Sequence, residues 1–258
     1  FGEAVKHLAN LAGMQPYMFS KQDEEREKKW KEYSSIFNHY VNHYHEELLK
    51  NELYSNARDY LKSRSLTKDE VKKFKIGYVE KNPIFFSKLS NNFSIESIME
   101  TGLFYFDEKK KNYVERFRGR LIFPINNISG QPIALGGRII DKSDYLAKYI
   151  NSPETSFFKK GSNLYSLDLA RKLSNKLENI FLVEGYMDVV GLHKNGIENV
   201  VANLGTSLTD KQIFTLNQFF DDIIICFDGD ESGYKAALRA AENSIKNLKP
   251  EKQISFLF

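Results

Sequence analysis

Two apolar runs in the last third of the chain are each followed at once by a pair of carboxylates. The segment IFLVEGYMDVV carries Glu184 and Asp188, and the segment IIICFDGDESG carries Asp228 and Asp230. If both runs are strands of one parallel sheet, both pairs emerge at the edge where open α/β sheets bind ligands. Asp188 would lie one helical turn beyond Glu184 and point the same way. The spacing therefore predicts four carboxylates at one sheet edge.

This acidic cluster has two interpretations. Converging carboxylates repel each other, and a hard divalent cation, Mg²⁺ or Mn²⁺, would offset that repulsion through oxygen ligands. Alternatively the acids are solvated or cap helices, and Asp230 is well placed to cap the helix that follows it. Gly185, Gly229 and Gly233 would allow close approach or a positive φ. From the spacing alone, both interpretations remain open.

A basic and polar set of residues precedes the acids. Arg116, Arg118 and Arg120 alternate in ERFRGRLIFPI, so on a strand all three would face one side. Guanidinium groups match phosphate oxygens, although a solvated strand face is the alternative. The other members of this set are Arg138, Lys148, Tyr149, Asn151, Ser152 and Lys160. We expect a phosphate-binding wall across a cleft from the carboxylates, with Tyr149 either stacked on a base or packed on the sheet.

The elements that would position these residues change character along the chain. Amphipathic periodicity predicts helices over residues 3–13 and 30–48, with a polar linker over 15–29 between them. Thr67 begins a capping box at the start of a further helix. Between residues 75 and 150, short segments rich in β-branched and aromatic residues predict strands.

From residue 168 onward, continuous apolar strands alternate with helices, a pattern typical of a parallel sheet covered on both faces. The predicted fold class is α/β, with a parallel sheet and flanking helices preceded by a mixed α+β basic subdomain. We expect three parts: a tail and linker over 1–28, the basic subdomain over 29–167, and the parallel-sheet subdomain over 168–258. The segment GLHKNGIE predicts an exposed His193 near a helix end, where a cation suits the helix dipole.

Composition limits the class of protein. The chain has 258 residues, 41% hydrophobic and 28% charged, which suits folded domains and excludes a disordered chain. A net charge of +3 does not identify a nucleic-acid binder, so any basic surface must be local. The single Cys226 excludes an intramolecular disulfide and fits a reducing compartment such as the cytoplasm. No apolar segment approaches the roughly 20 residues that cross a bilayer, so we expect no membrane partner.

Several motifs resemble one known family. VEGYMDVVGL, NLGTSLT and CFDGDESGYKAA resemble the Toprim fold, and RFRGRLIFPI, GGR and KYINSPET resemble the polymerase core of bacterial DnaG-type primases. The resemblance covers nearly the whole chain. It implies a nucleotidyl transferase that makes short RNA primers on single-stranded DNA, with Mg²⁺ or Mn²⁺ at Glu184, Asp188, Asp228 and Asp230. Glu184 is then either a ligand or a group that moves a proton.

The resemblance also implies partners and missing parts. The expected partners are a single-stranded DNA template, NTPs and a replicative helicase that binds a region outside this chain. Zinc would belong only to an N-terminal domain absent here, and the family's acidic site would continue beyond Phe258. Two alternatives remain: a Toprim nuclease or topoisomerase-like enzyme, and a non-catalytic Toprim nucleic-acid-binding module.

Overall fold

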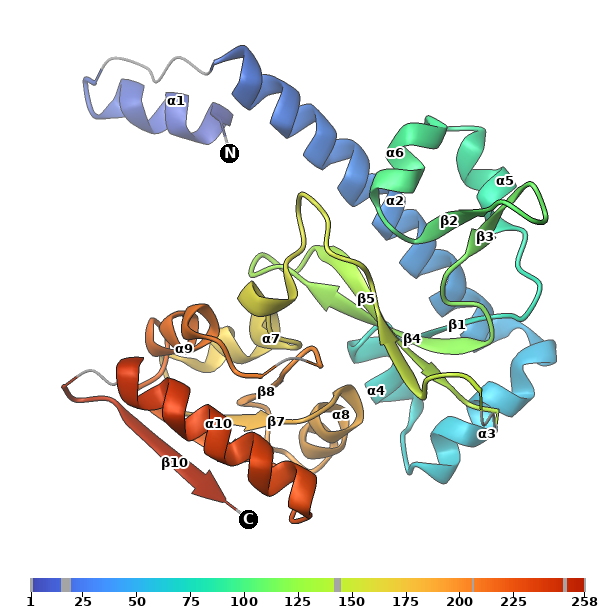
Figure 1. Cartoon of the computed structure of the whole chain (residues 1–258). Coiled ribbons are helices and arrows are strands. Elements are labelled where there is room, and N and C mark those ends of the chain that lie inside the picture. Colours follow the sequence, from blue (N-terminus) through green and yellow to red (C-terminus); the bar gives the residue numbers. More distant parts are fainter. Residues whose placement is uncertain (1, 15–19, 142–144, 206, 248–249, 258) are drawn as a thin grey trace.

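The computed structural model describes residues 2–14, 20–141, 145–205, 207–247 and 250–257. Its N-terminal arm consists of helix α1 (Gly2–Leu11) and the long helix α2 (Lys21–Lys50). Figure 1 shows α1 and the first half of α2 extending away from the body of the molecule. Ser20 and Asp23 form a capping box at the start of α2. The helix therefore begins within the expected linker, and the expected boundary after residue 28 falls inside it.

The basic subdomain is built on an antiparallel sheet with the strand order β1-β4-β5-β6. Its strands are β1 (Gly77–Val79), β4 (Arg120–Asn126), β5 (Pro132–Ile139) and β6 (Tyr149–Asn151). Around it lie η1 (Glu52–Tyr54), α3 (Ser55–Ser63), α4 (Lys68–Lys73), α5 (Phe85–Ser90) and α6 (Ile95–Glu100). A separate hairpin pairs β2 (Phe104–Asp107) with β3 (Asn112–Glu115). The predicted capping box at Thr67 is present, whereas α5, α6 and β3 were not predicted.

The second subdomain is a parallel sheet with the strand order β10-β9-β7-β8. Its strands are β7 (Asn179–Val183), β8 (Val200–Ala202), β9 (Asp222–Cys226) and β10 (Gln253–Leu257). The helices are η2 (Lys160–Ser162), α7 (Leu167–Ala170), η3 (Arg171–Leu173), α8 (Tyr186–Lys194), α9 (Asp210–Asn217) and α10 (Glu231–Asn247). The predicted α/β alternation and the parallel sheet are confirmed.

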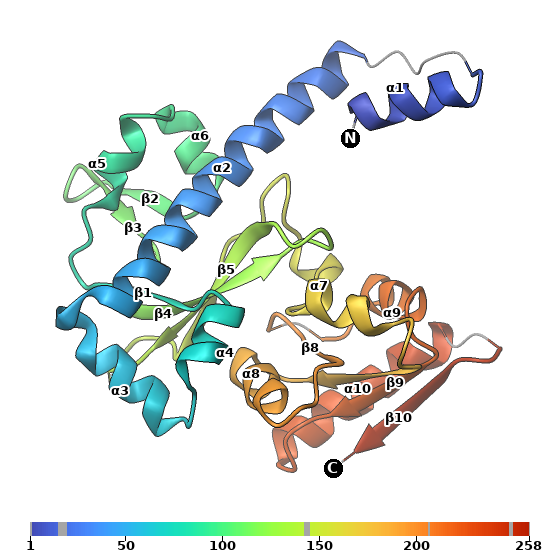
Figure 2. The ribbon, with the colours of Figure 1, turned by 180° about the vertical axis from the view of Figure 1, so that it is seen from behind.

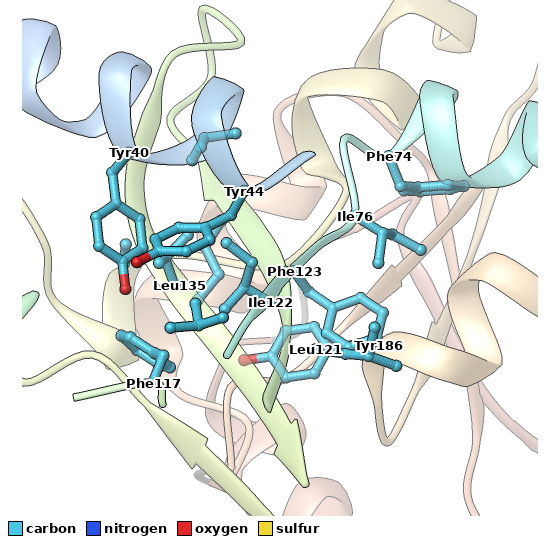
Figure 3. Close-up of a cluster of buried hydrophobic side chains, with 14 of the residues drawn as sticks. Tyr40, Tyr44, Phe74, Ile76, Phe117, Leu121, Ile122, Phe123, Leu135 and Tyr186 are labelled. Carbon is cyan, nitrogen blue, oxygen red and sulfur yellow. The ribbon is translucent and has the colours of Figure 1, made fainter. Parts of the chain in front are cut away.

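Two hydrophobic cores lie on the two faces of the parallel sheet. Ile180 and Leu182 of β7 face a core that also contains residues of α9 and α10. Val183 of the same strand faces the other way, into the core of the basic subdomain and α8. This second core is continuous across both subdomains, and Figure 3 shows Tyr186 of α8 beside Phe123 of β4. The parallel sheet is therefore packed directly onto its neighbour.

His193 is buried between the two subdomains. Its ring is 7% exposed and makes an edge contact with Phe74, with ring centroids 4.9 Å apart. Burial, assisted by the charge of Lys73, lowers the pKa of His193 to about 4. The expectation of an exposed cation near the helix end is wrong, because α8 docks this turn against the segment that follows α4. In the described part of the chain, no helix has the length and apolar character needed to cross a membrane.

A buried carboxyl ties three elements of the basic subdomain together. Glu115 at the end of β3 is 2% exposed and accepts hydrogen bonds from the Tyr44 hydroxyl (2.6 Å) and the Phe85 backbone N–H (3.0 Å). Burial raises the pKa of Glu115 to about 7, although both hydrogen bonds oppose the shift. The folded protein therefore binds this proton more tightly than the unfolded chain does.

We predict that Glu115 makes folding stability depend on pH. Its contribution is fully present below the unfolded-state pKa of about 4.5 and is lost as pH rises through about 7. The difference in free energy of unfolding between the protein and its Glu115→Gln variant should fall by up to about 3 kcal/mol over that window. Urea titrations from about pH 4 to pH 8 measure it, with the exposed Glu108→Gln as control. A difference that does not change with pH would contradict this role.

Candidate functional site: an acidic sheet edge facing a buried arginine

The position of the acidic edge is set by the ring of Tyr186, which lies between Glu184 and Asp188 in the sequence. This ring packs on Gly136 of β5, where an added Cβ would lie 2.3 Å from a ring carbon. It stacks on Phe123, with centroids 5.5 Å apart. Its hydroxyl donates to the Asn151 side-chain oxygen at 2.5 Å. The acidic edge is therefore fixed relative to β5 and β6 of the basic subdomain.

A hydrogen bond links two of the acidic residues across neighbouring strands. Glu184 follows β7, and its Oε1 accepts a hydrogen bond from the backbone N–H of Asp228, beyond β9, at 3.0 Å. Asp188 in the first turn of α8 accepts from the Gly185 backbone N–H at 3.0 Å. The surrounding protein raises the pKa of Asp188, the negative charge of Asp228 raises it further, and the Gly185 bond and the charge of Arg138 oppose the shift. Glu184, Asp188 and Asp228 thus lie at one edge, as predicted.

Asp230 caps the helix that follows it, as the alternative interpretation of the acidic cluster predicts. Its Oδ1 accepts from the backbone N–H of Gly233 at 2.8 Å, at the start of α10. A Cβ on Gly233 would lie 2.0 Å from the Asp228 carbonyl oxygen, so only glycine fits there. Gly185 has an extended φ of −144°, and a Cβ on Gly229 would meet no atom within 4 Å. Of the three glycines, Gly233 is the one that close approach requires.

The acidic edge fits a divalent cation in part. Its donors are oxygen atoms only, the ligands that Mg²⁺ and Mn²⁺ prefer. The repulsion between Asp188 and Asp228 is the kind of cost that a bound cation removes. Across the described ranges, however, no three His, Cys, Asp or Glu side chains are grouped closely enough to enclose a metal ion. A cation bound here would keep water ligands or take further ligands.

Arg138 connects the basic set to the acidic edge. It is 6% exposed on β5, and its guanidinium lies 5.0 Å from the ring centre of Tyr149 and 5.3 Å from that of Tyr60. It donates a hydrogen bond to the Tyr149 hydroxyl, and its charge acts on Asp188. Tyr149 therefore packs on the protein while keeping part of its surface exposed. Tyr60 was not predicted, because nothing in its local sequence marks it.

The predicted row of three arginines on one strand is wrong. Only Arg120 lies on a strand, and it is 5% exposed with a bond to the Lys148 carbonyl. Arg116 and Arg118 lie in the turn before β4, which Gly119 closes with a φ of +71°. Arg116 donates to the Gly102 carbonyl at 2.8 Å, and Arg118 donates to the Tyr105 hydroxyl at 2.8 Å.

The KYINS segment is divided between exposed and structural residues. Lys148 is exposed, and its ammonium lies 6.0 Å from the ring centre of Tyr149. Asn151 accepts from Tyr186 and donates to the Leu204 carbonyl, so it joins the two subdomains. Ser152 is fully buried and accepts from a backbone N–H of β5, which corrects its expected contact with a ligand. Lys160 lies apart in η2, where its backbone carbonyl accepts from Gln212.

We predict that Gly136→Ala lowers the free energy of unfolding by about 1–3 kcal/mol, because the new methyl overlaps the Tyr186 ring. Gly191→Ala is the matched control, since a Cβ there meets no atom within 4 Å and α8 should gain about 0.5–1 kcal/mol. Urea denaturation measures both. In a Tyr186→Leu background the cost of Gly136→Ala should shrink; an unchanged cost would show that the ring is not the obstacle.

We predict that Asp188→Asn folds at least as stably as the unaltered protein while losing affinity for divalent cations. The amide oxygen can still cap the Gly185 N–H, and the repulsion from Asp228 is gone. Thermal unfolding with and without Mn²⁺ measures both effects, with the exposed Asp69→Asn as control. Stabilisation by Mn²⁺ that persists undiminished in Asp188→Asn would exclude Asp188 as a ligand.

Known proteins share both halves of this structure. The family model of the DNA primase catalytic core, N-terminal domain, matches residues 43–171, and the Toprim domain model matches residues 178–258. A DNA primase of Lactococcus lactis is 38% identical over 94% of this chain and 38% of its own length. The chain spans between 30% and 39% of the length of this and two Pseudomonas primases.

Solved structures agree in fold. A DNA primase domain from Pseudomonas aeruginosa superposes with a TM-score of 0.82 at 36% identity, covering 88% of this chain and 70% of that one. A DnaG primase catalytic domain bound to ssDNA also has a TM-score of 0.82, at 31% identity, covering 90% of this chain and 72% of that one. With its Toprim sheet and its preceding basic subdomain, the chain belongs to the family of bacterial DnaG-type DNA primase catalytic cores.

Proposed function

We propose that this chain catalyses template-directed nucleotidyl transfer, making short RNA primers on single-stranded DNA for replication. The observation that carries the proposal is the packing of the acidic edge beside a basic side chain: the ring of Tyr149 lies 5.0 Å from the Arg138 guanidinium and 6.3 Å from the ring of Tyr186, which joins Glu184 to Asp188 in the chain. Reacting phosphates need positive charge around them, and an acidic edge favours phosphates only if cations neutralise it. A carboxylate edge beside a buried arginine meets both needs.

In this proposal the acidic residues bind the metal and the basic residues bind phosphate. Glu184, Asp188 and Asp228 would hold Mg²⁺ or Mn²⁺, with Asp230 as a further candidate whose present bond caps α10. The metal would supply a Lewis acid for the NTP triphosphate and the 3′-hydroxyl. Arg138 would bind phosphate oxygens, held in place by Tyr60 and Tyr149. Glu184 is a ligand or a proton-transfer group in this proposal.

The template would lie along exposed basic side chains of the preceding subdomain. Lys148 and Arg118 are exposed, and Arg116 is partly exposed. A related DnaG catalytic domain binds ssDNA, which supports the same partner here. The partners proposed for the whole protein are a single-stranded DNA template, NTPs and a replicative helicase, and its proposed location is the cytoplasm.

We predict that the protein makes template-dependent RNA from NTPs on circular single-stranded DNA with Mn²⁺, and that Asp228→Asn lowers the yield at least about 100-fold. The backbone bond from residue 228 to Glu184 survives this change, so the fold should persist. Asp222→Asn is the matched control, because it lies on the same strand at the opposite edge. A denaturing gel reads both new RNA and cut circles.

Each outcome of this assay is decisive about the chemistry. RNA that persists in Asp228→Asn would remove catalysis from the acidic edge. Cut circles without RNA would replace the proposal with a Toprim nuclease. DNA binding without either product, also after the downstream family segment is supplied, would favour a non-catalytic Toprim module.

A further inference from the structure

A pocket apart from the acidic edge lies between the two subdomains. Its volume is about 350 Å³, and it is lined by residues of α2, α4, the β4–β5 hairpin and α7. Figure 2 shows α2, α4 and α7 on the near side of the molecule, around the junction of the two sheets. The pocket shares no residue with the acidic edge or with the basic set. Its volume is within the range of small-molecule sites.

The deepest polar groups of this pocket lack partners. Tyr165 is 2% exposed and Ser166 is 4% exposed, yet within the described structure neither hydroxyl has a hydrogen-bond partner. Beside them, Asp168 is 5% exposed, and its Oδ2 accepts from the Asn126 amide at 3.0 Å. Buried polar groups are normally satisfied, so two unpartnered hydroxyls in residues that line one pocket are unusual.

The backbone at this point is also unusual. Ser166 has a φ of +68°, a left-handed conformation that non-glycine residues seldom adopt and that concentrates at functional sites. This residue lies at the junction where the chain enters the parallel-sheet subdomain. Ser166 lines the pocket, and its hydroxyl is buried.

The exposed part of the pocket is basic, and its walls combine polar and apolar residues. Lys73, Lys75 and Lys172 line it and are exposed. The Lys73 ammonium is paired with Glu198 and the Lys75 ammonium donates to Asn42, so an anion at the rim meets Lys172 directly and competes with those two partners for the others. Phe74 and Pro124 supply apolar wall atoms. The pocket therefore combines a buried hydrogen-bond acceptor, a partly apolar lining and a cationic rim.

We propose that this pocket binds a nucleoside monophosphate whose base carries an exocyclic amino group. The Asp168 carboxylate accepts from the amino group, as acidic side chains do when they bind cytosine N4. The lining encloses the base and sugar, and the rim lysines bind the phosphate. Uracil has no amino group and turns carbonyl oxygens toward Asp168, so it binds more weakly. The bound nucleotide touches both subdomains and stabilises their junction.

Calorimetric titration of the protein with CMP, AMP and UMP tests this proposal. EDTA is present throughout, so that no divalent cation holds a phosphate at the acidic edge. We expect CMP or AMP to bind more tightly than UMP. Lys172→Met should weaken that binding roughly threefold, because one exposed charge pair is lost. Lys176→Met, exposed nearby and outside the pocket, should leave it unchanged.

Two further variants examine the buried groups. Asp168→Asn should weaken CMP or AMP binding roughly fivefold and reduce the preference over UMP, since a charged acceptor becomes neutral. Ser166→Gly removes the hydroxyl and tolerates the positive φ, so it should weaken binding without loss of fold. Circular dichroism checks that each variant is folded. If Asp168→Asn unfolds, the nucleotide affinities of Lys172→Met and Ser166→Gly test the proposal.

Three results would overturn the proposal. The first is no binding of any of these nucleotides at millimolar concentration. The second is equal affinity for UMP and CMP. The third is binding that survives Lys172→Met and Ser166→Gly but is lost in Arg138→Gln, which would place the nucleotide at the basic set. None of these measurements depends on RNA synthesis, so the proposed function can fail or hold independently.

Discussion

The packing of the Tyr186 ring against Gly136 sets the geometry of the whole site. Tyr186 lies between two acidic residues of the Toprim sheet, and Gly136 lies two residues before Arg138 on β5. Because the ring occupies the space that any Cβ at Gly136 would fill, the acidic edge and the buried arginine come to face each other. The hydrogen bond from the Tyr186 hydroxyl to Asn151 fixes the rotation of the ring.

The acidic edge is electrostatically unfavourable as it stands. Burial raises the pKa of Asp188 and the charge of Asp228 adds to this shift, whereas the Gly185 cap and the charge of Arg138 oppose it. Carboxyl groups with a shifted pKa are more frequent at functional sites than elsewhere in proteins. Hydrophobic packing elsewhere in the molecule can offset the unfavourable free energy of this site. One hydrophobic core runs through both subdomains, and His193 is buried and neutral within it.

Several local patterns were correct because one physical signal dominated each of them. Buried apolar strands alternating with helices predicted the parallel sheet, and Thr67 begins the capping box of α4 as its spacing indicates. Between residues 75 and 150 the sequence patterns are compatible with both helices and strands. Phe86 of α5 stacks on Tyr113 of β3, with ring centroids 4.3 Å apart, so aromatic composition alone did not distinguish helix from strand there. The predicted arginine row was wrong because Arg116 and Arg118 lie in a turn that Gly119 closes, and the strand begins only at Arg120.

By itself, the sequence determined which residues can carry the chemistry: the carboxylates after β7 and β9, the arginines, and the order of strands and helices that brings the acids to one edge. These follow from local periodicity and from the topology of parallel sheets. Only the tertiary structure decided what each residue is free to do. In the folded protein Ser152 is buried, and Asn151 links the two subdomains. Asp230 caps α10, and Arg138 lies between two tyrosines. Burial and partner choice depend on segments distant in the chain, so no local pattern encodes them.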